Sequence, residues 1–212
     1  MTRRLSLVIG LAAIAVAVGL GVLIVVRPGV IVALDEAWNI EMGEWRSGPL
    51  VGFALVMNFL GGGWFATFVV PLGTALIALL LRGWRAAGFA LIAFLAGVLL
   101  VQIVKNALGR PRPQDLLVAS DFGSFPSGHT ANAAAIAVVL WFLFPRLATL
   151  IVGAVWVVAM GFSRTVLSVH WFSDTVGGAL IGAGTALVTA AVLWSWARAA
   201  KPAPAPEPGP AG

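Results

Sequence analysis

The chain has 212 residues, 60% of them hydrophobic, and its mean hydropathy of +1.02 is too high for a soluble globular protein of this length. It has no cysteine, which excludes disulfides, thiolate nucleophiles and cysteine-based zinc sites, and its two histidines leave few ligands for a transition metal. The net charge of +5 is scattered over short loops, which argues against nucleic acid as a partner. We therefore expect an integral membrane protein that uses no metal and no cofactor.

At about 20 apolar residues per crossing, the sequence predicts six transmembrane helices in an all-α polytopic bundle. Their approximate ranges are 5–26, 64–81, 86–104, 130–144, 148–165 and 175–196. The apolar stretch Leu50–Leu60 would rise only about 16 Å as a helix, and Gly61-Gly62-Gly63 follows it directly. We expect this stretch to be a loop or an interfacial helix between the first and second spans, and the segment 27–63 to shape the access of lipid to the protein.

Residues 1–200 are expected to form one membrane domain. Arg3 and Arg4 precede an apolar run, as in an export signal, but the run is longer than the usual apolar region of such a signal, so we expect an uncleaved first span. The Pro- and Ala-rich tail 201–212 can bury no core and is expected to be disordered. Gly178 and Gly182 have the small-xxx-small spacing that is typical of helix packing in membranes.

Polar residues gather in three short clusters, although only 10% of the chain is charged. The first two clusters lie between the third and fourth spans, and the third cluster follows a pair of spans that turns at Pro145-Arg146. Because a pair of crossings returns the chain to the same side, we expect all three clusters to meet at one membrane face. The clusters are Lys105 with Arg112-Pro113, Pro126-Ser127-Gly128-His129, and Ser163-Arg164 with His170 and Asp174.

The basic residues of the loops divide almost equally between the two sides of the membrane, so their raw count does not decide the orientation. If Lys105, Arg112 and Arg164 are set aside for a ligand, the positive-inside rule favours cytoplasmic termini. The three clusters then lie on the extracytoplasmic face.

Five residues of the clusters suit a tetrahedral anion. Lys105, Arg112 and Arg164 supply fixed positive charges, and guanidinium groups match phosphate oxygens in a bidentate manner. Ser127 and Gly128 come just before a helical run, where backbone N–H groups and the helix dipole favour an anion and glycine permits close approach. The pattern predicts a phosphate-binding site.

The remaining titratable residues suit covalent catalysis. If the chain is helical from His170 onward, Asp174 is its i+4 neighbour and can orient one ring nitrogen, which leaves the other free as a nucleophile. His129, at the head of another helix, is available to protonate the departing oxygen.

Each of these features has a structural explanation when taken alone. A Lys or Arg near a helix end commonly marks topology, which is our interpretation of Arg110, and Pro-Ser-Gly is commonly a turn with a serine cap. An Asp four residues after a His can be a simple helix-surface pair. Together, however, ionisable residues on one membrane face are costly and favour a functional site. We interpret five other polar residues as loop, cap or solvated residues: Asp35, Glu36, Asp115, Asp121 and Asn132.

The three clusters resemble the three-part signature of the type 2 phosphatidic acid phosphatase superfamily, in composition, spacing and order. The six-span layout is similar to that of its membrane-bound lipid phosphatases. The resemblance implies that His170 attacks phosphorus to give a phosphohistidine, that Asp174 orients it, and that His129 acts as the acid to the leaving group and then helps to activate water. It also implies that the phosphoryl oxygens are held by Lys105, Arg112, Ser127, Gly128 and Arg164, with a supporting hydrogen bond from Ser163.

A lipid phosphate is the substrate that this resemblance implies, with membrane lipids as the surroundings of the site. We predict undecaprenyl diphosphate first, ahead of phosphatidylglycerophosphate and phosphatidic acid. The soluble acid phosphatases and vanadate-binding haloperoxidases of the same superfamily are disfavoured by the hydropathy. The alternatives are a lipid phosphotransferase with the same histidine intermediate and a non-catalytic anion transporter or scaffold.

Overall fold

The structure is a computed structural model that describes residues 1–198, so the tail 201–212 lies outside the described residues. The described part is a helical bundle, and five of its helical segments are long and apolar enough to cross a membrane. They are α1 (Arg3–Val26), η1 (Phe65–Val69) continuous with α4 (Val70–Arg82), α5 (Trp84–Leu108), α7 (Leu147–Val166) and α8 (Phe172–Ala197). These segments agree with five of the predicted spans, and the chain is a multi-pass membrane protein.

The sixth predicted span is α6 (Gly128–Leu143), which is shorter than the others. Its 16 residues rise roughly 24 Å, less than the ~30 Å of a typical hydrocarbon core. The helix packs against α5, α7 and α8, and much of its length is buried alanine. Because neighbouring helices cover α6, its length does not have to match the thickness of the bilayer.

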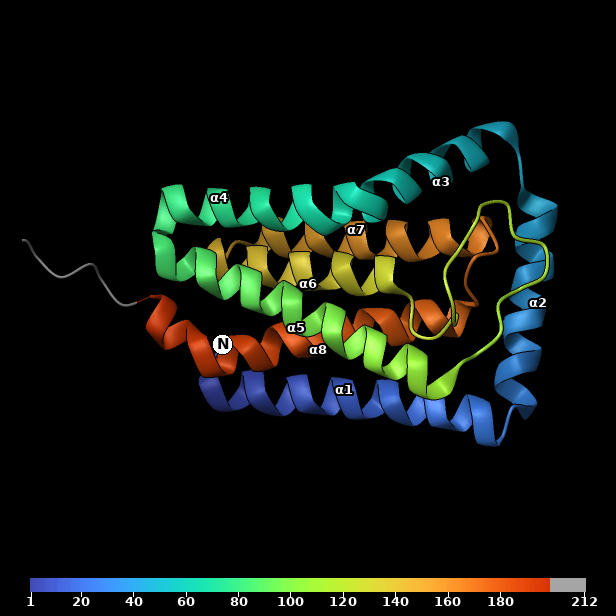
Figure 1. The fold of residues 1–212 in the computed structure, drawn as a ribbon, viewed down its shortest axis with the longest axis horizontal. Coiled ribbons are helices and arrows are strands. Elements are labelled where there is room, and N and C mark those ends of the chain that lie inside the picture. Colours follow the sequence, from blue (N-terminus) through green and yellow to red (C-terminus); the bar gives the residue numbers. More distant parts are fainter. Residues whose placement is uncertain (199–212) are drawn as a thin grey trace, which may run out of the picture.

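The stretch Leu50–Leu60 lies within α3 (Gly48–Gly61), so of the two forms that we expected between the first and second spans, a loop or an interfacial helix, a separate helix is the one present. Figure 1 shows α3 leading into α4 at an angle, and α3 packs against α7. The bend falls at Gly62, which is extended, and Gly63, which has a φ of +55°. The glycines therefore mark the change of direction between α3 and the second crossing.

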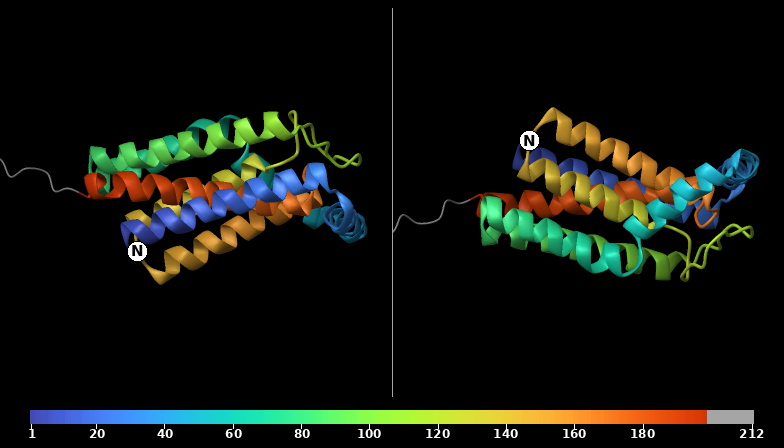
Figure 2. Two further views of the ribbon diagram at one scale, coloured as in Figure 1. Left: turned by 90° about the horizontal axis from the view of Figure 1, so that it is seen from below. Right: turned by 90° about the horizontal axis from the view of Figure 1, so that it is seen from above.

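A helix does lie across the bundle between the first and second crossings, and it is α2 (Gly29–Trp45). Figure 1 shows α2 running across the ends of the long helices, at the same end as the segment between α5 and α6. The amino terminus and the end of α8 lie at the opposite end of the bundle (Figures 1 and 2). Met42 of α2 is fully buried against Val166, Leu167 and Val169, so α2 is packed onto the α7–α8 turn.

Glycines bring α6 and α8 into close contact. A Cβ atom at Gly182 would overlap the carbonyl oxygen of Ala131, and one at Gly178 would overlap the carbonyl oxygen of Ser127. This confirms the packing role that the small-xxx-small spacing predicts. The same contact joins the heads of the two helices, where the Ser127 backbone N–H donates to the Asp174 carbonyl at 2.9 Å.

We expect Gly182→Ala to destabilise the protein by about 1–3 kcal/mol, because the new methyl group collides with backbone that cannot move without shifting α6. Gly73→Ala is the matched control, since nothing lies within 4 Å of a Cβ placed there on α4. The measurement is the thermal unfolding midpoint of both variants in detergent. Equal midpoints for the two variants would contradict the close approach of α6 to α8.

Candidate active site

The structure brings the three polar clusters together around one cavity of about 320 Å³ at the end of the bundle where α2 lies. The cavity is polar because side chains from four separate parts of the chain reach it. Lys105 comes from the last turn of α5, His129 from the first turn of α6, Arg164 from the last turn of α7, and His170 from the α7–α8 turn. The end of α3, with Asn58 and Gly62, forms another wall.

His170 and Asp174 lie next to each other at the start of α8, and both are buried. The Nδ1 atom of His170 is 3.5 Å from Oδ2 of Asp174, within ion-pair range but too long for a good hydrogen bond. Within residues 1–198 this Nδ1 has no closer partner. Catalytic hydrogen bonds are often loose before substrate binds. Asp174 is therefore placed to select the Nδ1–H tautomer, which leaves Nε2 of His170 unprotonated.

The pKa of His170 is lowered from its ordinary value of 6.5 to about 4, chiefly by burial of the imidazole. The Asp174 carboxylate opposes this shift, and the charges of Arg112 and Lys105 add to it. At neutral pH the ring is therefore uncharged, which is the form that a nucleophile requires.

His129 is the second histidine of the cavity, and its Nε2 is buried without a partner in the described chain. The end of α3 presses on this ring so closely that a Cβ atom at Gly62 would overlap Nε2. The His129 ring lies so close to position 62 that only glycine fits there. From the sequence alone, Gly62 was visible only as part of a run of three glycines. The two imidazoles line the same cavity, His129 from the first turn of α6 and His170 from the α7–α8 turn, as a nucleophile and a proton donor must.

Among the three predicted phosphate-binding cations, Arg164 has the most unused hydrogen-bonding capacity. Its side chain is fully buried, and Nη1 donates to the Asn58 side-chain oxygen at 2.8 Å. Its Nε and Nη2 atoms have no partner among residues 1–198. Buried guanidinium N–H groups without acceptors are costly, so a bound anion would satisfy them.

The other two cations share one carboxylate, that of Asp121. Lys105 Nζ lies 3.1 Å from both of its oxygens, and Arg112 Nη2 lies 2.6 Å from one of them. Arg112 is not part of the cavity wall, but its Nη1 is 3.4 Å from His170 Nε2. Asp121 is largely exposed, as expected of a solvated residue, yet it also acts as the counterion of both cations.

Three residues with smaller predicted roles lie near the cavity, with different bonding. Gly128 lines it, whereas the Ser127 N–H is already used by the Asp174 carbonyl. Ser127 caps α6 through its hydroxyl, which accepts from Thr130. Ser163 donates to the Met160 carbonyl at 2.7 Å within its own helix. Its hydrogen bond therefore supports α7 and is not directed at the cavity.

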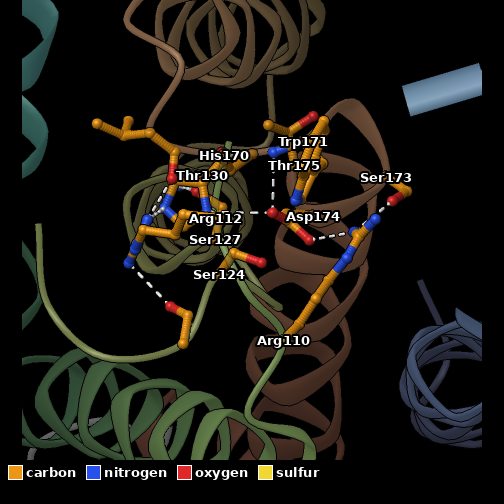
Figure 3. Close-up of polar contacts among 12 residues, drawn as sticks. Arg110, Arg112, Ser124, Ser127, Thr130, His170, Trp171, Ser173, Asp174 and Thr175 are labelled. Carbon is orange, nitrogen blue, oxygen red and sulfur yellow. Dashed lines mark hydrogen bonds and ion pairs between the residues drawn. The ribbon is translucent and has the colours of Figure 1, made fainter. Parts of the chain in front are cut away.

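Two residues that we interpreted as topological or solvated belong to the surroundings of the site. Arg110 is buried and lies 2.6 Å from Asp174 and 2.7 Å from Asp35, which is also buried (Figure 3 shows Arg110 and Asp174). Both interpretations were therefore wrong. No local spacing connects Asp35 with Arg110, because they are 75 residues apart and only the fold joins them.

The sequence profile of the PAP2 superfamily matches residues 86–198, which contain all three clusters. The chain belongs to this superfamily, so the resemblance seen in the motifs is confirmed. Helices α1 to α4 lie outside the matched range.

The similar proteins include lipid phosphatases and a transmembrane phosphatase of known structure. The chain is 33% identical to a lipid A 1-phosphatase of Rhizobium johnstonii over 44% of its own length and 42% of the relative's, and 37% identical to phosphatidylglycerophosphatase B of Bacillus subtilis over 43% and 50%. These matches thus span half or less of the curated relatives. The crystal structure of a transmembrane PAP2-type phosphatidylglycerolphosphate phosphatase from Bacillus subtilis superimposes with a TM-score of 0.76 and 25% identity, over 88% of this chain and 96% of that one.

We expect Asp121→Asn to strengthen the binding of a phosphate analogue such as vanadate by roughly two- to fivefold, the range of an exposed ion pair. The physical reason is that Lys105 and Arg112 then no longer have a competing carboxylate. Isothermal titration of the detergent-purified protein gives the dissociation constant, with Glu44→Gln on α2 as the exposed control. Weaker binding in Asp121→Asn would show instead that Asp121 holds the two cations in place for the anion.

Proposed function

We propose that this protein is a membrane lipid phosphatase that hydrolyses a phosphate monoester or diphosphate of a lipid through a phosphohistidine on His170. The observation that carries the proposal is the polar cavity that is lined by two imidazoles and by the guanidinium of Arg164, whose Nε and Nη2 atoms have no partner among residues 1–198. That arrangement offers a nucleophile, an acid and an anion site within one small volume.

An apolar cavity next to the polar one supports a lipid as the substrate. It has a volume of about 220 Å³ and lies between α4, α5 and α6. It shares four lining residues with the polar cavity: Gly62, Gln102, Gly128 and His129. A substrate with a phosphate head and a hydrocarbon tail fits such a pair of cavities. The leaving oxygen, which lies on the lipid side of the phosphorus atom that is attacked, would then be close to His129.

The proposed reaction has two steps. His170 Nε2 attacks phosphorus and forms an N–P bond while the bond to the leaving oxygen breaks, and His129 delivers a proton to that oxygen. Water then attacks the phosphohistidine, with His129 accepting its proton, and inorganic phosphate leaves. Lys105, Arg112 and Arg164 offset the negative charge of the phosphoryl oxygens throughout.

We further propose that the site faces the extracytoplasmic side and that the described ends of the chain lie in the cytoplasm. The positive-inside argument supports this orientation. We propose undecaprenyl diphosphate as the first substrate to test. Lipid A and phosphatidylglycerophosphate should be tested with it, because two relatives of this chain are named for these lipids.

We expect the detergent-purified protein to release phosphate from at least one lipid phosphate in the presence of chelator, and His170→Ala to lose at least roughly a thousandfold in kcat. The substrates to compare are undecaprenyl diphosphate, phosphatidylglycerophosphate, phosphatidic acid, a lipid A 1-phosphate and a soluble phosphate ester. Radiolabelled substrate should leave a base-stable, acid-labile phosphate on the wild-type protein only.

The variant His129→Ala distinguishes the role of His129 as proton donor from the role of His170 as nucleophile. It should lose roughly a hundredfold on an alkyl phosphate and regain most of this on a nitrophenyl ester, whose leaving group needs no proton. Arg146→Gln, at the exposed far end of α7, is the control.

Transfer of label from the radiolabelled substrate to a second lipid instead of water would identify a phosphotransferase. Absence of both products from folded protein would favour an anion transporter or scaffold.

The pH dependence follows from the lowered pKa of His170. Since the neutral ring is the nucleophile and its pKa is about 4, kcat/KM should not fall on this account between pH 6.5 and 5 and should decline as the pH approaches 4. The profile is measured with a lipid whose own phosphate titration is known from phosphorus NMR, so that its contribution can be removed. A corrected acid limb centred near 6.5 would contradict a buried, uncharged nucleophile.

A further inference from the structure

We propose that Arg110 and Asp35 are positioning residues that hold the Asp174 carboxylate, and through it the tautomer of His170, and that α2 is the helix that provides this support. The inference deepens the proposed function and rests on it only for its kinetic readout.

The two oxygens of Asp174 have separate partners. Oδ1 accepts from Arg110 Nη1 at 2.6 Å, whereas Oδ2 accepts from the Trp171 backbone N–H at 2.9 Å and faces His170 Nδ1. Figure 3 shows Arg110 and Trp171 approaching the carboxylate from different sides. Arg110 therefore sets the plane of the carboxylate, and this plane directs Oδ2 at the histidine.

Arg110 is itself held in position. Its Nη1 also donates to the Ser173 hydroxyl at 2.8 Å, its Nη2 donates to Asp35 at 2.7 Å, and its guanidinium lies 5.6 Å from the centre of the Trp171 ring. Arg110, Asp35 and Asp174 are all at most 5% exposed. Buried charges are stable only when they are paired and hydrogen-bonded, so the three groups depend on one another.

Asp35 connects Arg110 and the start of α8 to α2. Its Oδ1 accepts from the Ser173 backbone N–H at 2.9 Å, and its Oδ2 accepts from the Ser173 hydroxyl at 2.5 Å. Ser173 is in the first turn of α8, where a carboxylate satisfies a free N–H and interacts favourably with the helix dipole. One carboxylate of α2 thus fixes both Arg110 and the head of the helix that carries Asp174.

A second polar contact from α2 holds the other end of the turn that carries His170. Ser168 has a φ of +48°, which is unusual for a residue with a side chain. Its hydroxyl donates to Asn39 of α2 at 2.8 Å and lies 3.0 Å from Asp115. Arg46, at the end of α2, bonds to the same Asp115 at 2.8 Å and to the Val166 carbonyl at 3.0 Å. His170 therefore lies between two attachments to α2.

The position of Arg110 makes it a support and not a phosphate ligand. It is not part of the cavity wall, and both of its terminal nitrogens are bonded to carboxylates. Arg112, two residues later, instead reaches His170 Nε2. Asp35 lies outside the range that the superfamily profile matches, so this support comes from the amino-terminal part of the chain.

The test compares Arg110→Gln, Arg110→Lys and Asp35→Asn with two matched controls. The controls are Arg146→Gln and Glu36→Gln, which change exposed residues, the second of them next to Asp35 on α2. We expect Arg110→Gln to lower kcat by roughly 10–100-fold with KM changed by less than about threefold. Arg110→Lys should restore part of this loss because it keeps a charge near Asp174, and Asp35→Asn should show a smaller loss in kcat. Both controls should match the wild type.

The second readout is the nitrogen NMR spectrum of the histidine rings, and it needs no turnover. Only two histidines are present, so uniform histidine labelling gives two sets of ring signals, and those of His170 are assigned by their absence from His170→Ala. In the wild type His170 should be a single tautomer protonated at Nδ1. In Arg110→Gln we expect a mixture of both neutral tautomers.

The outcomes separate this inference from the proposed function. If the wild type releases no phosphate, the proposed function fails, while the ring signals still decide whether Arg110 positions His170. Unchanged tautomer and unchanged kcat in a folded Arg110→Gln would overturn the inference. If that variant does not fold, Arg110→Lys and Asp35→Asn decide. A lower unfolding midpoint with wild-type ring signals and kcat would assign both residues a purely structural role and overturn it equally.

Discussion

Burial of the Asp174 carboxylate is the constraint on which the rest of this site depends. A carboxylate without solvent must be neutralised and hydrogen-bonded, or it takes up a proton. Arg110 and the Trp171 N–H meet this requirement, and they leave one oxygen facing His170. Arg110 then needs a second carboxylate, which comes from α2. A single buried charge thus accounts for a set of contacts that extends from the first turn of α8 to the helix across the end of the bundle.

The helix packing serves the same site. Gly178 and Gly182 let α8 approach the backbone of α6, and this contact places the head of α6 beside the head of α8. His129 of α6 and His170 of the α7–α8 turn consequently line one cavity. Gly62 likewise allows close contact at the end of α3, where the absence of a side chain leaves room for the His129 ring. In a membrane, where apolar burial does little to drive helices together, such close backbone contact is a main source of packing energy.

Two cavities of opposite character meet at His129. The polar one has cations and imidazoles, whereas the apolar one is enclosed by α4, α5 and α6 and continues toward the middle of the bundle. His129 therefore lies where a phosphoryl group in the polar cavity would adjoin the lipid-linked remainder of the proposed substrate.

The helical class, most of the crossings and the three polar clusters follow from the sequence, because apolar length and ionisable residues near span ends are local properties. Lys105, Arg164, His129 and His170 were predicted from residue type, position near span ends and the resemblance of the motifs, and the fold gathers them around one cavity. The roles of Arg110 and Asp35 were not predicted, since an isolated arginine or aspartate near a span end looks the same whether it is solvated or paired. Their partners are more than 60 residues away along the chain, and only the packing of α2 and of the α5–α6 segment against the start of α8 brings them within hydrogen-bonding distance. The residues that touch a substrate carry a local pattern, whereas those that support them are determined by contacts between distant segments.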